Sequence, residues 1–214
     1  MTDEQTDVFA FLADPATHGI AEPVVRIGTH AAVVFLAGPD AYKVKRAVRF
    51  PFLDQSTLEK RRAICEAEVA INRHFTPELY LGTVPIIRRD GALHLGGAGT
   101  VVEWAVHLKR FDETMTLDCV SERGALTPAI AGALAGMVLR CHGQAMVRDG
   151  AAATEALGGV VEETLQELRD QAEVFPPAAA ASLGTTMREA FARVRPLLLE
   201  RGEAGRARWC HGDL

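Results

Sequence analysis

The sequence predicts an α+β fold in two lobes, a β-rich N-terminal lobe over residues 1–110 and a helical lobe over residues 111–214. Three observations lead to this prediction. Short apolar segments separated by turn-forming residues dominate the first half, as strands do. A single helix-start signature interrupts them at residues 56–59. Longer segments of helical character, several rich in alanine, follow from residue 127 onward.

The β-rich half contains six segments of strand character. They cover residues 24–27, 33–36, 41–45, 82–88, 92–95 and 101–110. Tight turns are expected at residues 28–30 and 37–40, where glycine occurs beside other turn-forming residues. The Ser-Thr-Leu-Glu sequence at 56–59 fits a capping box, which predicts a helix from there to about residue 75. A short helix is also expected at residues 7–13.

The second half is expected to be helical throughout. Its helices are predicted at residues 127–146, 154–175 and 182–201. Thr127 and Pro128 supply an N-cap followed by a first-turn proline, which is a common helix start. The alanine-rich stretch at 178–181 is interpreted either as a linker or as the start of the last helix. A connector near residues 108–114 joins the two predicted lobes.

The composition is typical of a soluble, globular, cytoplasmic protein. With 23 Lys and Arg against 28 Asp and Glu, the chain lacks the basic excess expected of a nucleic-acid-binding protein. No apolar run reaches the roughly 18 residues of a membrane span, and the polar residues 1–5 do not resemble a secretory signal. The cysteines are widely spaced and are expected to be reduced thiols: Cys65, Cys119, Cys141 and Cys210.

Two lysines lie on the third predicted strand. Because alternate side chains of a strand share a face, Ala41, Lys43 and Lys45 should point to one side, with Tyr42 and Val44 on the other. A strand lysine most often simply reaches solvent. The pattern of the following helix offers a second interpretation, in which a lysine binds a carboxylate.

A glutamate lies on the apolar stripe of the helix that follows. Helical spacing places Ile64, Ile71 and Phe75 on one face, and Glu68 falls on the same face, whereas Glu66 falls on roughly the opposite one. A carboxylate among apolar side chains costs free energy unless it is paired. The pattern is consistent either with an ion pair between Glu68 and a lysine of the neighbouring strand or with a carboxylate that reaches past the stripe into water.

The last four residues complete a recognisable order of functional groups. His211-Gly212-Asp213-Leu214 follows a strand lysine, a helix glutamate and a helical stretch. This combination resembles the aminoglycoside phosphotransferase and choline kinase family, whose catalytic loop has the same His-Gly-Asp sequence. The resemblance implies a protein-kinase-like two-lobed fold, with a β-rich N-lobe containing one helix and an incomplete helical C-lobe.

The resemblance is closer to a bacterial subgroup in which such a region is often fused to a P-loop ATPase domain. It covers most of residues 20–112 together with the terminal motif. The helices between residues 127 and 205 match in kind only. The residues that carry the resemblance are Thr29-His30, Val34-Phe35-Leu36-Ala37-Gly38, Ala41-Tyr42-Lys43-Val44-Lys45, Phe52-Leu53-Asp54, Glu59-Lys60-Arg61-Arg62, Leu79-Tyr80-Leu81-Gly82 and Glu103-Trp104-Ala105-Val106.

The resemblance assigns nucleotide-binding roles to the strand and the helix. Ala41 would form the floor of an adenine pocket, and Lys43 would reach the α- and β-phosphates of ATP. Glu68 would hold Lys43 in place. Lys45 is the alternative lysine and Glu66 the alternative acid.

The resemblance also assigns roles to the first turn and to the connector. Gly28, Thr29 and His30, within the turn at residues 28–32, would lie over the phosphates of the nucleotide. The turn has no Gly-x-Gly-x-x-Gly pattern, which this class of kinase often lacks. The connector at residues 108–111 would contact adenine through its backbone.

Catalysis is implied for the terminal motif. Asp213 would accept or orient the proton of the substrate hydroxyl, and His211 would brace the backbone of the loop. The family's Mg²⁺ ligands, an asparagine and an aspartate, come after the catalytic aspartate, so they are expected beyond residue 214.

Two functional hypotheses follow. The first is a small-molecule kinase that transfers the γ-phosphate of ATP to an unidentified hydroxyl-bearing substrate, here as an incomplete fragment that is expected to be inactive alone. The second is a pseudokinase-like module that binds nucleotide and regulates an attached ATPase domain. The first predicts metal ligands just past Leu214, whereas the second predicts that they are absent while Lys43 and Glu68 remain.

Overall fold

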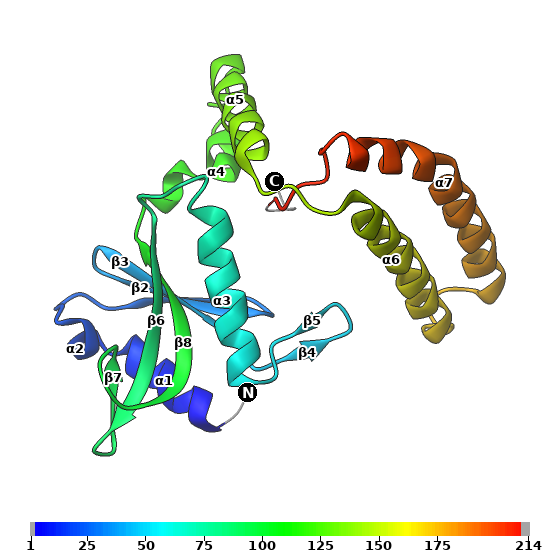
Figure 1. The fold of residues 1–214 in the computed structure, drawn as a ribbon. Coiled ribbons are helices and arrows are strands. Elements are labelled where there is room, and N and C mark those ends of the chain that lie inside the picture. The colour runs from blue at the N-terminus through cyan, green and yellow to red at the C-terminus, as the bar shows by residue number, and fades with distance from the viewer. Residues whose placement is uncertain (1–2, 211–214) are drawn as a thin grey trace. The chain divides into compact units, whose positions relative to one another are not determined.

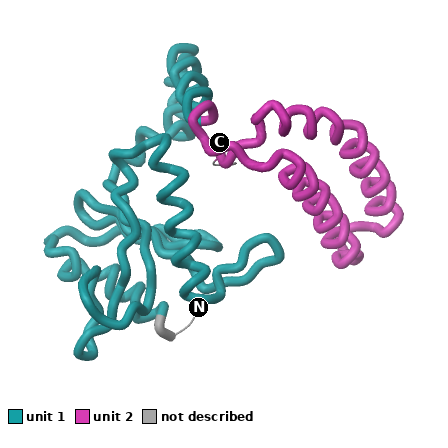
Figure 2. Tube along the Cα trace, viewed as in Figure 1, with its two compact units in different colours: residues 1–141 teal, residues 142–214 magenta. Residues whose placement is uncertain are grey.

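The computed structural model describes residues 3–210 of the 214-residue chain. The chain forms two compact units, residues 1–141 and residues 142–214 (Figure 2). The first unit is a mixture of helices and an antiparallel sheet, and the second is helical, which confirms the α+β class. The boundary between the compact units falls after residue 141, whereas the functional lobes predicted from the sequence divide near residue 110.

The first unit is built on a six-stranded antiparallel sheet with strand order β1-β2-β3-β8-β6-β7 (Figure 1). Its strands are β1 (Val25–Gly28), β2 (Ala32–Ala37), β3 (Asp40–Lys45), β6 (Tyr80–Arg89), β7 (Ala92–Leu95) and β8 (Thr100–Lys109). All six strands predicted from the sequence are therefore present. The structure adds a small hairpin of β4 (Arg49–Phe50) and β5 (Leu53–Asp54), whose two-residue strands are too short to show a periodic pattern.

Helix α1 (Asp3–Ala13) packs on one face of this sheet. Its residues Phe9 and Leu12 join Val33, Phe35 and Val44 in a core of almost fully buried side chains. The helix begins four residues before the predicted start, and a short helix, α2 (Pro15–His18), follows it. This arrangement buries one face of the central strands.

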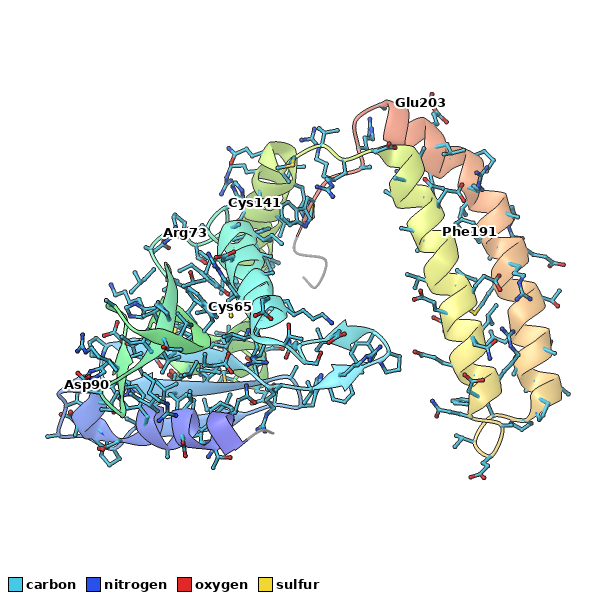
Figure 3. The ribbon with its side chains drawn as sticks, turned by 60° about the horizontal axis from the view of Figure 1, so that its bottom comes forward. Cys65, Arg73, Asp90, Cys141, Phe191 and Glu203 are labelled. Carbon is cyan, nitrogen blue, oxygen red and sulfur yellow. The ribbon has the colours of Figure 1, made fainter. Side chains whose placement is uncertain are left out.

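Helix α3 (Leu58–Asn72) covers the opposite face of the sheet, where Cys65 and Val69 pack against Val106 of β8. Figure 3 marks Cys65 on this helix. The side chain of Thr57 caps the helix by accepting a hydrogen bond from the Lys60 amide, so the cap lies one residue after the serine that opens the predicted capping box. The helix ends at Asn72 rather than at residue 75.

The rest of the first unit is a 3-10 turn, η1 (Glu113–Met115), followed by α4 (Leu117–Glu122) and α5 (Pro128–Gln144). Helix α5 starts at the proline that the sequence identifies as a first-turn residue and ends two residues before the predicted end. The short helices η1 and α4 were not predicted. Asp112 caps η1 by accepting a hydrogen bond from the Thr114 amide at 2.9 Å.

The second unit is a pair of long helices, α6 (Gly150–Asp170) and α7 (Pro177–Glu203). Helix α6 begins four residues before the predicted start because Asp149 caps it through the Ala151 and Ala152 amides. Helix α7 begins at its first-turn proline, so the stretch at 178–181 is helical.

The two helices approach each other most closely at glycines. A β-carbon on Gly150 would lie 2.1 Å from the α-carbon of Gly202, and one on Gly158 would lie 3.0 Å from the ring of Phe191. Figure 3 labels Phe191 on α7. Side chains at these positions would force the helices apart. Within residues 3–210, no helix has both the length and the apolar character that crossing a membrane requires.

Candidate functional site

The candidate site is an ion-pair cluster between β3 and α3. Lys43 of β3 donates a hydrogen bond from Nζ to Oε1 of Glu68 at 2.9 Å. Lys45, two residues further along the same strand, donates to the other oxygen, Oε2. The side chain of Glu68 is 12% exposed, that of Lys45 10% and that of Lys43 32%. One carboxylate therefore binds two lysines, one at each oxygen.

The strand register places both lysines on the face that α3 covers. Lys43 pairs with Val106, which belongs to the core beneath α3. Because alternate residues of a strand share a face, Lys45 and Ala41 lie on that side as well. The ion pair between Glu68 and a strand lysine that the sequence offered as one interpretation is confirmed. The two alternative lysines turn out to share the same acid.

Glu66, the alternative acid, is exposed and does not reach the lysines. It binds Arg62 instead, one helical turn earlier, at 2.8 Å. The buried face of α3 also differs from the predicted one. Ile64 and Ile71 are only partly buried, whereas the neighbouring row of Arg61, Cys65 and Val69 is buried. The apolar pattern alone was misleading here because the deepest row begins with an arginine.

Electrostatics favour the ionised form of Glu68. Burial by itself raises the pKa of this carboxyl, but the charges of Lys43 and Lys45 outweigh burial and hold the pKa below its ordinary value. The pKa values of two neighbouring groups are raised instead. Burial raises the pKa of the Cys65 thiol to about 12, and burial together with the charge of Glu68 raises the pKa of the Tyr80 phenol to about 12. The Glu68 carboxylate therefore lies between two lysines, and the nearby thiol and phenol stay neutral at neutral pH.

A second, fully buried ion pair fixes α3 to the sheet. Arg61 donates from Nε to both carboxylate oxygens of Glu103 on β8, at 2.9 and 3.0 Å. Gln5 of α1 donates to Oε2 of Glu103 at 2.8 Å and to the carbonyl of Lys45 at 2.9 Å. No role of these residues follows from the sequence alone. The helix alone gave no sufficient signal for this pair, because a hydrophobic pattern assigns Arg61 to solvent.

An apolar pocket of about 240 Å³ lies on the sheet face that carries Lys43, because Val34 and Leu36 of its lining pair with Lys43 and Ala41. Ala41, two residues before Lys43, lines it together with Leu108 and Phe111 of the connector. The remaining lining residues are Ile27, Lys109, Arg110 and Glu113. The predicted floor residue and the predicted connector thus meet at one pocket.

The backbone of the connector is partly committed to internal hydrogen bonds. The Lys109 amide donates to the carbonyl of Leu79, and the Arg110 amide donates to the carbonyl of Pro39, each at 2.8 Å. The next amide, that of Phe111, has no protein acceptor among residues 3–210. A ligand in the pocket could therefore accept a hydrogen bond from Phe111.

The turn between β1 and β2 lies at the Lys45 end of β3, because Ala32 pairs with Lys45. The Thr29 amide donates to the carbonyl of Ala32 at 2.8 Å, which closes the turn. Gly28 ends β1, and a β-carbon there would lie 3.1 Å from the Arg46 guanidinium. The ring of His30 lies 5.9 Å from that of Phe50 in the β4–β5 hairpin.

The predicted catalytic residues His211 and Asp213 lie outside the described residues. Within residues 3–210, no group of three His, Cys, Asp or Glu side chains is arranged to hold a metal ion. The site that the structure does describe is therefore the part formed by β1, β2, β3, β8 and α3.

Comparisons with known proteins find distant, uncharacterized relatives. The chain is 30% identical over 158 residues to an uncharacterized protein of Mycobacterium tuberculosis and to one of Mycobacterium bovis. The match covers 71% of this chain but 30% of each relative, so the chain spans less than a third of their length. No protein-family model matches the chain. No solved structure matches it at a significant level.

Proposed function

We propose that the chain contains the nucleotide-binding lobe of an ATP-dependent phosphotransferase with a protein-kinase-like two-lobed fold. More particularly, the protein is a small-molecule kinase that resembles aminoglycoside phosphotransferases and transfers the γ-phosphate of ATP to a substrate hydroxyl. The observation that carries the proposal is the Lys43–Glu68 ion pair, on the sheet face where Ala41 lines an apolar pocket. A kinase needs this combination of an apolar site for adenine and a cation for phosphate.

The pocket is proposed to bind adenine. Ala41 and Leu108 offer apolar contacts, and the small Ala41 side chain leaves room for a planar ring. Orientation of the ring requires a polar contact, because apolar walls do not distinguish its edges. The amide of Phe111, which has no acceptor within residues 3–210, is the proposed hydrogen-bond donor to a ring nitrogen.

The phosphates are proposed to lie towards Lys43, with the turn at Gly28, Thr29 and His30 above them. Mg²⁺ supplies charge neutralisation of the phosphates in ATP-dependent transfer, and the described residues supply no obvious set of ligands for it. Asp213 is proposed to take up the proton of the substrate hydroxyl, and His211 to brace its loop.

Nucleotide binding is the direct test. ADP affinity is measured by isothermal titration calorimetry for the natural chain, Lys43→Ala, Ile27→Asp and the control Lys60→Ala. Lys60 is a half-exposed lysine of α3 that binds Asp54, so its removal changes the net charge equally but away from the pocket. Lys43→Ala should lower ADP affinity about 10- to 100-fold through loss of a charged hydrogen bond. Ile27→Asp places a charge in the apolar wall and should also weaken binding.

The outcomes separate the hypotheses. ADP affinity that is equal in all four proteins, or absent from the natural chain, would refute the nucleotide site. Binding with the expected ranking supports it. If the natural gene product then binds ATP and Mg²⁺ without transferring phosphate to any hydroxyl compound, the function is that of a regulatory nucleotide-binding module instead.

A further inference from the structure

The lysines of the candidate site are not equivalent, although both bind Glu68. In the described part of the chain, Glu68 is the ionic partner of both Lys43 and Lys45. The three side chains together carry one net positive charge. An anion could therefore be bound at this cluster without removal of the carboxylate.

The surroundings of the two lysines differ in a way that suggests separate tasks. The Lys45 side chain is 10% exposed, and its backbone carbonyl accepts a hydrogen bond from Gln5 at 2.9 Å. Gln5 also binds Glu103, the partner of Arg61. Lys45 is therefore fixed at both its backbone and its side chain.

Lys43 is held less tightly. Its side chain is 32% exposed, and it lies on the same face as Ala41, two residues away, which lines the apolar pocket. Lys45 lies further along the strand, two residues beyond Lys43. The more accessible lysine is thus the one nearer in sequence to the pocket lining.

We propose that Lys45 is a positioning residue that neutralises Glu68, so that the charge of Lys43 stays available for the phosphates of a nucleotide. This assignment rests on the proposed function. With a single lysine, a phosphate would have to compete with Glu68 for the cation, and a carboxylate that is 12% exposed would lose its partner. With two lysines, Glu68 remains paired with Lys45 when Lys43 turns to the phosphate.

The test compares two double variants of identical composition and net charge. Lys45→Met/Glu68→Gln retains Lys43 alone, and Lys43→Met/Glu68→Gln retains Lys45 alone. The single variants Lys45→Met and Lys43→Met complete the set. Affinities for ADP and for adenosine, which lacks phosphates, are measured by calorimetry, so that the ratio of the two isolates the phosphate contribution.

Adenosine affinity should be the same in all five proteins. Lys45→Met should lower ADP affinity about tenfold or more, because Glu68 then neutralises Lys43. Adding Glu68→Gln to it should restore ADP affinity. Adding Glu68→Gln to Lys43→Met should not, because the remaining lysine is the positioning one. A purely structural role of Lys45 would change both ligands together and would show no such recovery.

Several results would overturn the assignment. Equal ADP affinity of the two double variants would show that the lysines are interchangeable, and unchanged affinity in Lys45→Met would show that it positions nothing. If Lys45→Met loses its cooperative thermal transition, Lys45→Gln takes its place, because the amide still donates a hydrogen bond without charge. If the natural chain binds neither ADP nor adenosine, the proposed function is overturned and this assignment with it. If adenosine binding is intact but the ADP affinities of the variants do not follow the expected order, the assignment alone is overturned.

Discussion

The buried Arg61–Glu103 ion pair provides a quantitative test of how α3, and with it Glu68, is held on the sheet. The arginine side chain is 7% exposed and the glutamate side chain 0%. Arg61→Met keeps an unbranched side chain of similar reach but removes the charge and its hydrogen bonds. The Glu103 carboxylate then remains buried without a cation.

The expected loss of stability depends on the hydrogen bonds that Glu103 retains. Removal of one partner of a buried ion pair costs about 3–5 kcal/mol. Because Glu103 still accepts hydrogen bonds from Gln5 at 2.8 Å and from the Trp104 amide at 3.0 Å, the lower end of this range is expected. Arg61→Met/Glu103→Leu removes both charges, and its stability should lie within about 1–2 kcal/mol of the natural chain.

Urea unfolding followed by tryptophan fluorescence measures the difference. A Trp209→Phe background leaves Trp104 of the first unit as the reporter. With a slope of about 1–3 kcal/mol per molar urea, Arg61→Met should lower the midpoint by roughly 1–3 M. The control Arg49→Met breaks a pair with Asp54 in which the arginine side chain is 79% exposed, and such an exposed pair is worth about 0.2–1 kcal/mol, so its midpoint should change much less.

Two results would refute the reasoning about this pair. A loss of less than about 1 kcal/mol in Arg61→Met would mean that the carboxylate is not dependent on its cation. A double variant as unstable as Arg61→Met would mean that packing or the Gln5 hydrogen bond, rather than charge, is the dominant contribution of these residues.

Three further predictions concern the same unit and the terminal motif. Burial raises and the charges of Lys43 and Lys45 lower the pKa of Glu68, with the net result below its ordinary value of 4.5. The free energy of unfolding of the natural chain should therefore exceed that of Glu68→Gln by its full amount above about pH 5, and the difference should shrink as the pH falls further. Urea titrations measure this difference, and an equal difference at pH 3 and pH 7 would contradict the prediction. Because burial raises the pKa of Cys65 to about 12, its thiol should resist iodoacetamide at pH 8 until urea unfolds the first unit. Peptide mass spectrometry measures the labelling, and rapid labelling of the folded protein would count against the burial of Cys65. In a form of the protein that transfers phosphate, Asp213→Asn should abolish transfer yet preserve ADP binding, and a fully active Asp213→Asn enzyme would remove this residue from the proposed mechanism.

Local patterns were sufficient to predict the strands and the order of candidate groups. The period of two along β3 places Ala41, Lys43 and Lys45 on one face whatever the strand packs against. A carboxylate on the apolar stripe of a helix costs free energy unless it is paired, which made Glu68 a candidate for an ion pair, with a carboxylate that reaches water as the alternative. Its partner was left open between two lysines, and the structure shows that both bind it.

Cap positions and the buried faces of helices could be predicted less well from the sequence. Ser56 and Thr57 are adjacent candidates, and only the backbone conformation decides that Thr57 accepts the Lys60 amide. The deepest row of α3 includes Arg61, which a hydrophobic pattern assigns to solvent. A charged residue can occupy a buried position when a distant element supplies its counter-charge, so the helix face could not be read from the helix alone.

The sequence by itself determined the α+β class, the strand segments and the residue types of the candidate site, because these depend on periodicities within a few residues. Tertiary structure alone decided the partners. Gln5 meets Glu103, which lies 98 residues away, and Arg61 meets the same carboxylate from 42 residues away. The apolar pocket likewise combines β1, β2, β3 and β8 with the connector. Such contacts depend on strand order and on helix placement, which are set by the burial of the whole core rather than by any local pattern.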